Sequence, residues 1–468
     1  MIEDSLYDDW VPLCKRDKLS FGRIMAIASG NLIPGLMYNI IFALLSPTRQ
    51  LLGLPPIAEL MLLLAGSLIG FFLAPLLGVL SDGLMFKYGR RRIFIVIGTI
   101  VAVASLLLLS FYDKIGSTVS QKKIIFIFSI ILAFLSVNVI QSPARVLCSD
   151  VTPPNQQNQM SNICQVFGGI APIVSNLLGG LKLKAFGLKE TEFLLVICVS
   201  VAVLAMIVVC IAAREEPLRV KPPKVNPFKQ TFRAFKKIPR PFSRVILPFL
   251  FANMAIYQFQ IKFTDFMGRD IYEHRVMYSD EDTKKAIYEN GVKRGMLCMT
   301  VNGAAQLIYS FINSKIVDSL GMKWTMVIGN SLMTVCLLIF IWVRQEYAFF
   351  AIVGLLGISQ VIFTAIPYAI VSLVIPTEEL GNNLGILNCF CVIGQQISNF
   401  GLGYFVDGVF GKDIYTLSTK KIGFSAVFGA LTVLASFWIV QPSLAETGNY
   451  NQIDESGTGA VSGLSIAE

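Results

Sequence analysis

Residues Ile93 to Phe111 read IFIVIGTIVAVASLLLLSF, a run without a single charged side chain. A helix rises about 1.5 Å per residue, so an apolar run of about 20 residues crosses the roughly 30 Å hydrocarbon core of a bilayer. The run has to be helical, because lipid offers no hydrogen-bond partner to an open backbone group. Directly before it stands the positively charged cluster Gly89-Arg90-Arg91-Arg92. The stretch therefore predicts a membrane-spanning α-helix that begins beside a basic loop.

Runs of the same kind recur along all 468 residues. The chain is 54% hydrophobic and only 15% charged, whereas soluble domains are about 25% charged. We therefore predict an all-α, polytopic membrane protein with about twelve transmembrane helices. The expected helices lie near residues 24–45, 58–80, 93–111, 124–147, 160–181, 193–213, 245–270, 294–316, 325–343, 347–375, 384–406 and 421–440.

The longest polar connection runs from Arg214 to Arg244 and is rich in lysine, arginine and proline. Positive charge favours the cytosolic side of a membrane, and proline discourages a continuous helix. We interpret the connection as a cytosolic linker between two pseudo-symmetric six-helix bundles, and the even number of spans then places both termini in the cytosol. The division is a cytosolic segment (residues 1–20), a first bundle (21–213), the basic linker (214–244), a second bundle (245–440) and a disordered tail (441–468).

Traces of an internal repeat support this division. Asp82 and the arginine cluster follow the second expected helix, and Asp318 with Gly321-Met322-Lys323 follows the eighth. These are corresponding loops of the two bundles. Duplicated six-helix halves are typical of transporters, in which a solute is held near the membrane midplane between halves that rock.

Several other function classes find no support in the sequence. Most of the nine cysteines lie inside apolar segments, where a thiol acts as a small packing residue. The single histidine, His274, belongs to no cluster with metal spacing, so we expect neither a metal nor another cofactor. No nucleophile–base pair or phosphate-binding glycine loop indicates an enzyme. The net charge of +9 comes from loops, and we interpret it as a topology signal rather than a nucleic-acid surface.

Four segments, taken together, resemble one family of carriers. Gly78-Val79-Leu80-Ser81-Asp82, followed by Gly89-Arg90-Arg91-Arg92, is similar to the signature loop of the major facilitator superfamily. Its spacing and third arginine are closer to the sucrose/proton symporters of the glycoside-pentoside-hexuronide:cation symporter group. The other segments that resemble this group are Gln141-Ser142-Pro143-Ala144-Arg145-Val146-Leu147 with Asp150, Asp265-Phe266-Met267-Gly268-Arg269-Asp270-Ile271-Tyr272, and Ile366-Pro367-Tyr368-Ala369 with Leu384-Gly385-Ile386-Leu387-Asn388.

The resemblance implies alternating-access transport of a sucrose-like disaccharide or another glucoside, coupled to protons. Phe134 and Phe263 depart from the family pattern, because the plant symporters carry acids at these positions. An uncoupled facilitative sugar carrier is therefore the alternative. A sugar sensor that does not transport is a further alternative, although the linker and tail are short for signalling. We expect a monomer embedded in the plasma membrane or an internal membrane.

Arg145 is the first candidate for a role in substrate binding. An arginine inside a membrane helix costs several kcal/mol unless it is paired or hydrated. Its guanidinium can donate two parallel hydrogen bonds to neighbouring sugar hydroxyls or to a carboxylate. The alternative is that Arg145 lies close to the cytosolic interface and simply extends its charge into water.

A second group of candidates lies on the seventh expected helix. Lys262, Asp265 and Arg269 are spaced i, i+3 and i+7, which places opposite charges along one helix face. Asp265 is our first candidate for a coupling acid, and Asp270 is the second. The alternative is a salt-bridge network at the outer end of this helix.

Neutral hydrogen-bonding residues near mid-depth form the third group. Asparagine and glutamine offer both a donor and an acceptor to a hydroxyl, and an aromatic ring can cover the apolar face of a sugar. Alternatively, such amides bond one helix to another inside the bundle. The site residues that we predict from this group are Asn138, Gln141, Tyr257 and Gln258.

The signature loop predicts a conformational latch rather than a ligand site. Its arginines can pair with carboxylates at helix ends when the cytosolic face is closed, and Asp150, Glu378 and Glu379 are the expected partners. The alternative is a positive cluster that only sets the topology. The predicted latch residues are Gly78, Asp82, Gly89, Arg90, Arg91, Arg92 and Asp318.

Overall fold

The computed structural model describes most of the chain between residues 11 and 440, and every regular element in the described part is helical. The predicted disordered tail, the first ten residues and most of the predicted linker lie outside the described residues. The described residues are 11–86, 89–180, 190–215, 232–233, 235–276, 278, 280–376, 379–410 and 416–440.

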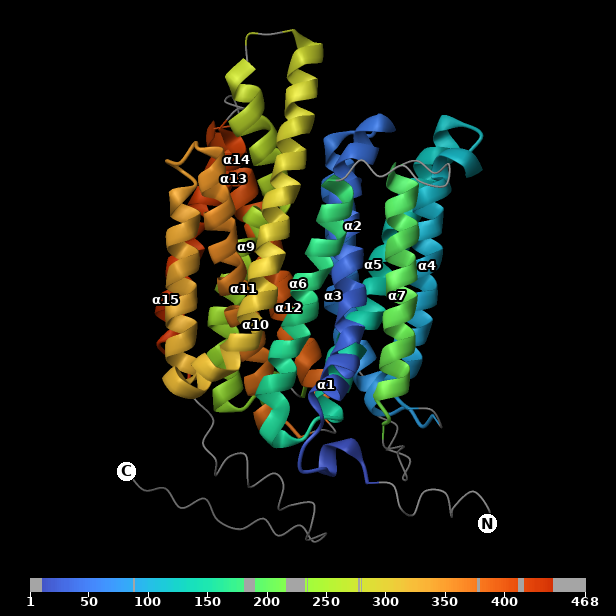
Figure 1. Cartoon of the computed structure of the whole chain (residues 1–468), viewed down its shortest axis with the longest axis vertical. Helices are drawn as coiled ribbons and strands as arrows, with labels where there is room; N and C mark the ends of the chain where they lie inside the picture. The colour runs from blue at the N-terminus through green and yellow to red at the C-terminus, as the bar shows by residue number, and fades with distance from the viewer. Residues whose placement is uncertain are drawn as a thin grey trace.

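The first half of the chain forms one group of helices and the second half another, and Figure 1 shows the two groups side by side. The first group comprises α1 (Phe21–Ala28), η2 (Ser29–Asn31), α2 (Leu32–Leu51), α3 (Pro56–Asp82), α4 (Arg92–Ile115), α5 (Val119–Asp150), α6 (Gln157–Gly180) and α7 (Glu190–Ala212). The second comprises α9 (Arg240–Asp265), η4 (Phe266–Tyr272), η5 (Glu273–Val276), α10 (Glu281–Ile339), α11 (Glu346–Val374), α12 (Leu380–Gln396), η6 (Ile397–Leu402), α13 (Gly403–Phe410), α14 (Leu417–Phe424) and α15 (Ala426–Ser436). Two short 3₁₀ turns, Leu13–Lys15 and Pro154–Gln156, precede α1 and α6.

The predicted all-α membrane fold is confirmed, and the count of spans has a structural explanation. Among the described residues, nine helices are long and apolar enough to cross a membrane. One of these, α10, contains two of the predicted spans, because Gly321 breaks it with φ 80° and ψ 158°. The predicted spans 160–181 and 384–406 correspond to α6 and to α12 with η6, which are not among the nine. These helices carry many amides and hydroxyls, which lower their hydropathy.

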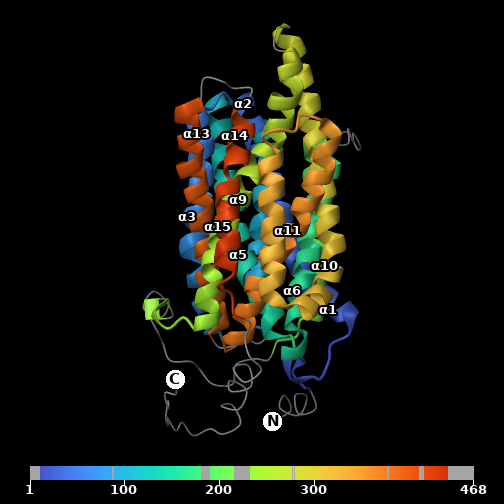
Figure 2. The same cartoon turned by 90° about the vertical axis from the view of Figure 1, so that its left-hand side faces the viewer.

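Gly321 reverses the direction of the chain inside α10. Arg294 precedes this glycine and Glu346 follows it, yet their side chains form an ion pair. The two parts of α10 therefore run antiparallel, and the chain turns at this glycine without a separate loop. We name the two ends of the molecule from residues near them: the Gly89 end, where α3 gives way to α4, and the Asp280 end, where α10 begins. Figure 2 shows the first turns of α10 rising above the other helices at the Asp280 end.

Local sequence signals explain where several helices begin. Thr118 and Gln121 form a reciprocal capping box at the start of α5, which satisfies two orphan backbone donors. The carboxylate of Asp280 accepts the N–H of Thr283 at 2.9 Å and caps α10. This hydrogen bond lowers the pKa of the exposed Asp280 carboxyl from its ordinary value.

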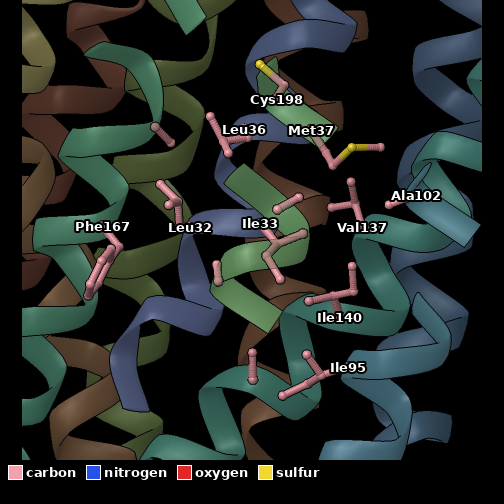
Figure 3. Close-up of a cluster of buried hydrophobic side chains, with 14 of the residues drawn as sticks. Leu32, Ile33, Leu36, Met37, Ile95, Ala102, Val137, Ile140, Phe167 and Cys198 are labelled. Atoms are coloured by element: carbon pink, nitrogen blue, oxygen red, sulfur yellow. The ribbon is translucent and has the colours of Figure 1, made fainter. Parts of the chain in front are cut away.

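Each half has its own apolar interior. One buried cluster draws its residues from the segment between Leu13 and Ala213, and the other draws nearly all of its residues from the segment between Phe242 and Ile439. Figure 3 shows part of the first cluster, where Met37 of α2 points toward Val137 of α5 and Ala102 of α4.

The halves meet along two pairs of helices, α6 with α10 and α3 with α12. Glycines allow both pairs to approach closely. A Cβ atom on Gly169 would lie 2.6 Å from the carbonyl oxygen of Gly303, and one on Gly78 would lie 2.5 Å from that of Gly381. Small residues at such crossings let helix backbones come into contact.

The reversal at Gly321 generates a first prediction. A positive φ combined with this ψ is essentially restricted to glycine, so Gly321→Ala should destabilise the fold by about 1–3 kcal/mol. Thermal unfolding of the purified protein in detergent should show a lower melting temperature. Gly22→Ala is the matched control, because a Cβ there meets nothing within 4 Å. Equal melting temperatures for the two variants would contradict the proposed role of Gly321.

Candidate functional site

Arg145 lies between the two halves and contacts both. It projects from α5, donates a hydrogen bond to the Tyr368 hydroxyl on α11, and places its guanidinium carbon 4.3 Å from the centre of the Tyr368 ring. One turn further along both helices, the hydroxyls of Ser149 and Ser372 are 3.0 Å apart. The charge is therefore held by the opposite half of the protein, an arrangement different from an arginine that merely extends into interfacial water.

Two small cavities flank this arginine–tyrosine contact. The empty space measures about 280 Å³ at the first and about 390 Å³ at the second, and both volumes include space that is open to solvent. Arg145, Tyr368 and Leu384 line both, so helices of both halves contribute walls. The volume that the centre of a water molecule can reach is only about 10 Å³ in the first cavity and about 30 Å³ in the second, so a disaccharide would fit only after the halves separate further. The remaining lining residues are Asn138, Gln141, Ser142 and Asn388 in the first cavity, and Cys148, Ser149, Gln157, Met160, Ser161, Cys164, Gln165 and Ser372 in the second.

The predicted amides divide into two groups. Asn138 and Gln141 line the first cavity, although the Asn138 amide also donates to the backbone of its own helix at Phe134, 2.8 Å away. Gln258 instead joins two helices, because its amide donates to the Ser398 carbonyl at 2.7 Å and to the Ser398 hydroxyl at 3.3 Å. Its geometry is therefore that of the alternative stated for these amides, a bond between helices.

Tyr257 belongs to a buried group of side chains around Tyr38 of α2. It is buried in α9 and, like Arg145, Tyr368 and Cys391, lies close enough to Tyr38 on α2 to interact with it electrostatically. The group thus combines residues from four or more helices of both halves. Sequence reasoning quoted Tyr368 and Asn388 only within the resembling segments; their role as cavity walls depends on tertiary packing.

Asp265 and Arg269 lie at the Asp280 end and are not among the residues that line the cavities. The Asp265 carboxylate accepts hydrogen bonds from Tyr288 at 3.1 Å and from Ser418 at 2.8 Å. Arg269 approaches it to 3.7 Å, and the two side chains are 35% and 31% exposed for Arg269 and Asp265, respectively. This partly solvated network matches the alternative of a salt-bridge cluster at the outer end of the helix.

Asp270 is more deeply enclosed, with 3% of its surface exposed. Its Oδ2 accepts the backbone N–H of Thr419 at 2.7 Å and the Thr419 hydroxyl at 2.6 Å. Arg344 donates to the same hydroxyl at 2.9 Å. Asp270 thereby joins the π-helical segment η4 to the first turn of α14, where a helix N-terminus favours negative charge. Its second oxygen, Oδ1, is buried without a hydrogen-bond partner among the described residues.

At the Gly89 end, the signature arginines are paired within the first half. Arg91 is fully buried, and its Nε lies 3.0 Å from Oδ2 of Asp150. Arg90 reaches the same oxygen at 3.0 Å. Arg91 also donates to the hydroxyl of Ser81 at the end of α3. Asp150 thus occupies the position expected of a partner for the loop.

Glu215, which follows α7, is a partner that sequence reasoning missed. Its carboxylate accepts the backbone N–H of Arg91 at 2.9 Å and that of Arg92 at 3.0 Å, so it caps the start of α4. Burial raises the pKa of this carboxyl from its ordinary value, against the opposing effect of these two hydrogen bonds. Gly89 has φ 110°, and a Cβ there would lie 2.5 Å from Oε1 of Glu215. The available sequence signal was an acid immediately after an apolar helix.

The other predicted latch residues occupy varied positions. Gly78 packs against Gly381 between the halves, whereas Asp318 is exposed. Glu379 precedes α12 as its N-cap residue. The Asp82 side chain and Glu378 lie outside what the structure describes. Among the described residues, no group of three or more histidine, cysteine or acidic side chains is arranged to hold a metal ion.

Comparisons with known proteins agree with this architecture. A sequence model described as Major Facilitator Superfamily matches residues 19–272 and 292–458. Sucrose transport protein SUC4 of Arabidopsis thaliana is 26% identical over 424 residues, which cover 79% of this chain and 81% of that protein. Sucrose transport protein SUT5 of Oryza sativa subsp. indica is 24% identical over 457 residues, which cover 85% of this chain and 84% of that protein.

Two solved structures share the fold at low sequence identity. The human organic anion transporter MFSD10 (TETRAN) has a TM-score of 0.63 at 14% identity and covers 90% of this chain and 100% of its own. A bacterial homologue of the iron transporter ferroportin, in an outward-facing state, has a TM-score of 0.60 at 13% identity and covers 92% of this chain and 99% of its own.

The capping role of Glu215 generates a second prediction. Glu215→Ala leaves two buried backbone donors without a partner, which should cost about 1–3 kcal/mol for each donor that water does not reach. The melting temperature in detergent should fall. The melting temperature of Glu215→Gln should fall less, because its amide oxygen still accepts one hydrogen bond. Glu289→Ala, at an exposed position of α10, is the control and should leave the melting temperature unchanged. A stable Glu215→Ala variant would contradict the cap.

Proposed function

This chain belongs to the Major Facilitator Superfamily and is an integral membrane protein, and on that premise we propose that it carries a sugar across the membrane by alternating access. The observation that carries the proposal is the Arg145–Tyr368 contact between the two halves, with a cavity on either side of it. The sucrose transport proteins of Arabidopsis and rice support a sugar as the solute, because each matches most of this chain.

The chemistry around Arg145 suits a neutral solute rich in hydroxyl groups. A guanidinium has five N–H donors in a fixed plane, and its contact with Tyr368 uses only part of this capacity. Asn138, Gln141 and Asn388 add groups that donate and accept in the adjoining cavity. The tyrosine rings offer apolar faces for the carbon skeleton. A bound sugar would take over hydrogen bonds that now join the two halves, which links binding to their separation.

The conformation also supports alternating access, because polar contacts between the halves form a barrier on the side of the Gly89 end. Besides Arg145 with Tyr368 and Ser149 with Ser372, Ser161 donates to the Ala365 carbonyl at 2.9 Å and Asn313 donates to Asn162 at 2.5 Å. We call these four contacts the gate. Release of a solute toward the Gly89 end requires all four to break. We assign this end to the cytosol, since the basic linker follows α7 there.

For coupling to protons, Asp270 is the residue that the geometry favours. Protonation would weaken its carboxylate as an acceptor for Thr419 and would give its unpartnered oxygen a hydrogen to donate. The contact between η4 and α14, at the end opposite the gate, would then depend on the proton. Uncoupled sugar transport is the second candidate. The described residues that line the cavities support it, since they include Arg145 but no carboxylate.

A third prediction tests the role of Arg145. Arg145→Lys keeps the charge but loses the planar group of donors, and the loss of charge-assisted hydrogen bonds worth about 1.5–3 kcal/mol lowers the apparent sugar affinity roughly tenfold to hundredfold. Uptake of labelled sucrose and of other glucosides into proteoliposomes measures this effect. Arg233→Lys, at an exposed position before α9, should transport normally. Unchanged uptake by Arg145→Lys would rule out the proposed binding site.

A fourth prediction separates coupled from uncoupled transport. In proteoliposomes with an imposed pH gradient, the intact protein should accumulate sugar, whereas Asp270→Asn should lose accumulation and keep exchange of internal for external sugar. Asp265→Asn tests the neighbouring acid, and Asp282→Asn, at an exposed position with no predicted role, is the control. If the intact protein ignored the pH gradient while still equilibrating sugar, the coupled form would be wrong and the uncoupled form would stand.

A further inference from the structure

The wall of the second cavity contains two cysteines from different helices. Cys148 lies on α5 with 2% of its surface exposed, and Cys164 lies on α6 and is partly exposed. Both thiols are reduced and both line the same space. The chain has other buried cysteines, such as Cys198 and Cys336, but these line neither cavity.

One amide brings the two sulfur atoms together. Nδ2 of Asn31, in η2, lies 3.4 Å from the sulfur of Cys148 and 3.4 Å from the sulfur of Cys164. The Cys148 thiol also lies 3.8 Å from the carbonyl oxygen of Ile27. Because both sulfurs contact the same nitrogen atom, they are neighbours in space, and a disulfide would require them to approach to about 2 Å.

From this geometry we propose that Cys148 and Cys164 form a dithiol site, which a small hydroperoxide oxidises to a disulfide and which the gate shields from the Gly89 end. Tyr368 and Ser372, on the opposite half, cover the cavity that contains both thiols. Each makes a gate contact, with Arg145 and Ser149 respectively. Opening the gate therefore exposes the thiols, and closing it protects them.

The reaction balances with hydrogen peroxide as the oxidant. The thiolate of the more exposed Cys164 attacks one peroxide oxygen, so that an S–O bond forms, the O–O bond breaks, and the departing hydroxide takes up the thiol proton as water. Cys148 then attacks the sulfur of the sulfenic acid; the S–S bond forms, the S–O bond breaks, and a second water leaves. The two thiols supply the two electrons that reduce the peroxide.

Closing this disulfide would tie α5 to α6 next to the gate. Cys148 is one turn from Arg145 on α5, and Cys164 is one turn from Ser161 on α6. Both of these neighbours make gate contacts. We therefore expect the oxidised protein to transport sugar more slowly. This consequence rests on the proposed function, whereas formation of the disulfide does not depend on it.

The direct test maps disulfides on the purified full-length protein after treatment with hydrogen peroxide. Free thiols are alkylated, the chain is digested, and mass spectrometry should find a linked pair of peptides that contain Cys148 and Cys164. Cys164→Ser should abolish the link, and Cys198→Ser should leave it intact. Absence of the link in the intact protein, or peroxide-treated Cys148 and Cys164 that both remain open to alkylation, would overturn the proposal.

A second measurement tests the shielding by the gate. Tyr368→Phe removes the acceptor for Arg145, so the gate should open more often and the disulfide should form about tenfold faster. The melting temperature of the variant shows whether its fold is intact. If Tyr368→Phe formed the disulfide at the rate of the intact protein, the shielding would be refuted. Disulfide mapping does not depend on sugar uptake. A protein that fails to transport sugar can therefore still be tested for the Cys148–Cys164 link, so failure of this proposal and failure of the transport function are distinguishable.

Discussion

A polar group that this chain buries within a bilayer costs free energy unless it finds a partner inside the protein, because hydrocarbon supplies none. This constraint fixes the helical backbone and also determines where the charged side chains lie. Arg91 is fully buried yet is paired with Asp150, and Arg145 is held by a tyrosine of the opposite half. The first pairing ties helices together within one half. The second joins the two halves, and in the proposed mechanism a solute replaces it with contacts of its own.

The sequence was sufficient for the fold because the helical spans depend on local composition. Apolar runs located the spans, and the basic signature loop led to Asp150 as a partner, since helix ends at one face of a bundle come close together. Glu215 was not foreseen, because a carboxylate that caps a helix distant in sequence leaves no periodic pattern. The reversal at Gly321 was foreseen only as a corresponding loop, whereas the structure joins the two spans directly.

The candidate site was less predictable, because an amide near mid-depth has two uses that look the same in a sequence. Asn138 and Gln141 line a cavity, whereas Gln258 joins α9 to η6. Only packing distinguishes them. The acids of the seventh span also depend on packing. Their spacing predicts a charged helix face, but in the structure Asp265 and Asp270 lie at the end opposite the gate. The proposed sugar site and the proposed coupling acid are therefore separated in space.

The direct joining of two spans at Gly321 has a consequence for biogenesis. With no intervening loop, neither segment can be threaded through the membrane or turned over alone, because the two are legs of one hairpin. The orientation of the first leg dictates that of the second. We therefore expect topogenic charges that flank either leg to act on both, so that this part of the chain inserts into the bilayer as one unit.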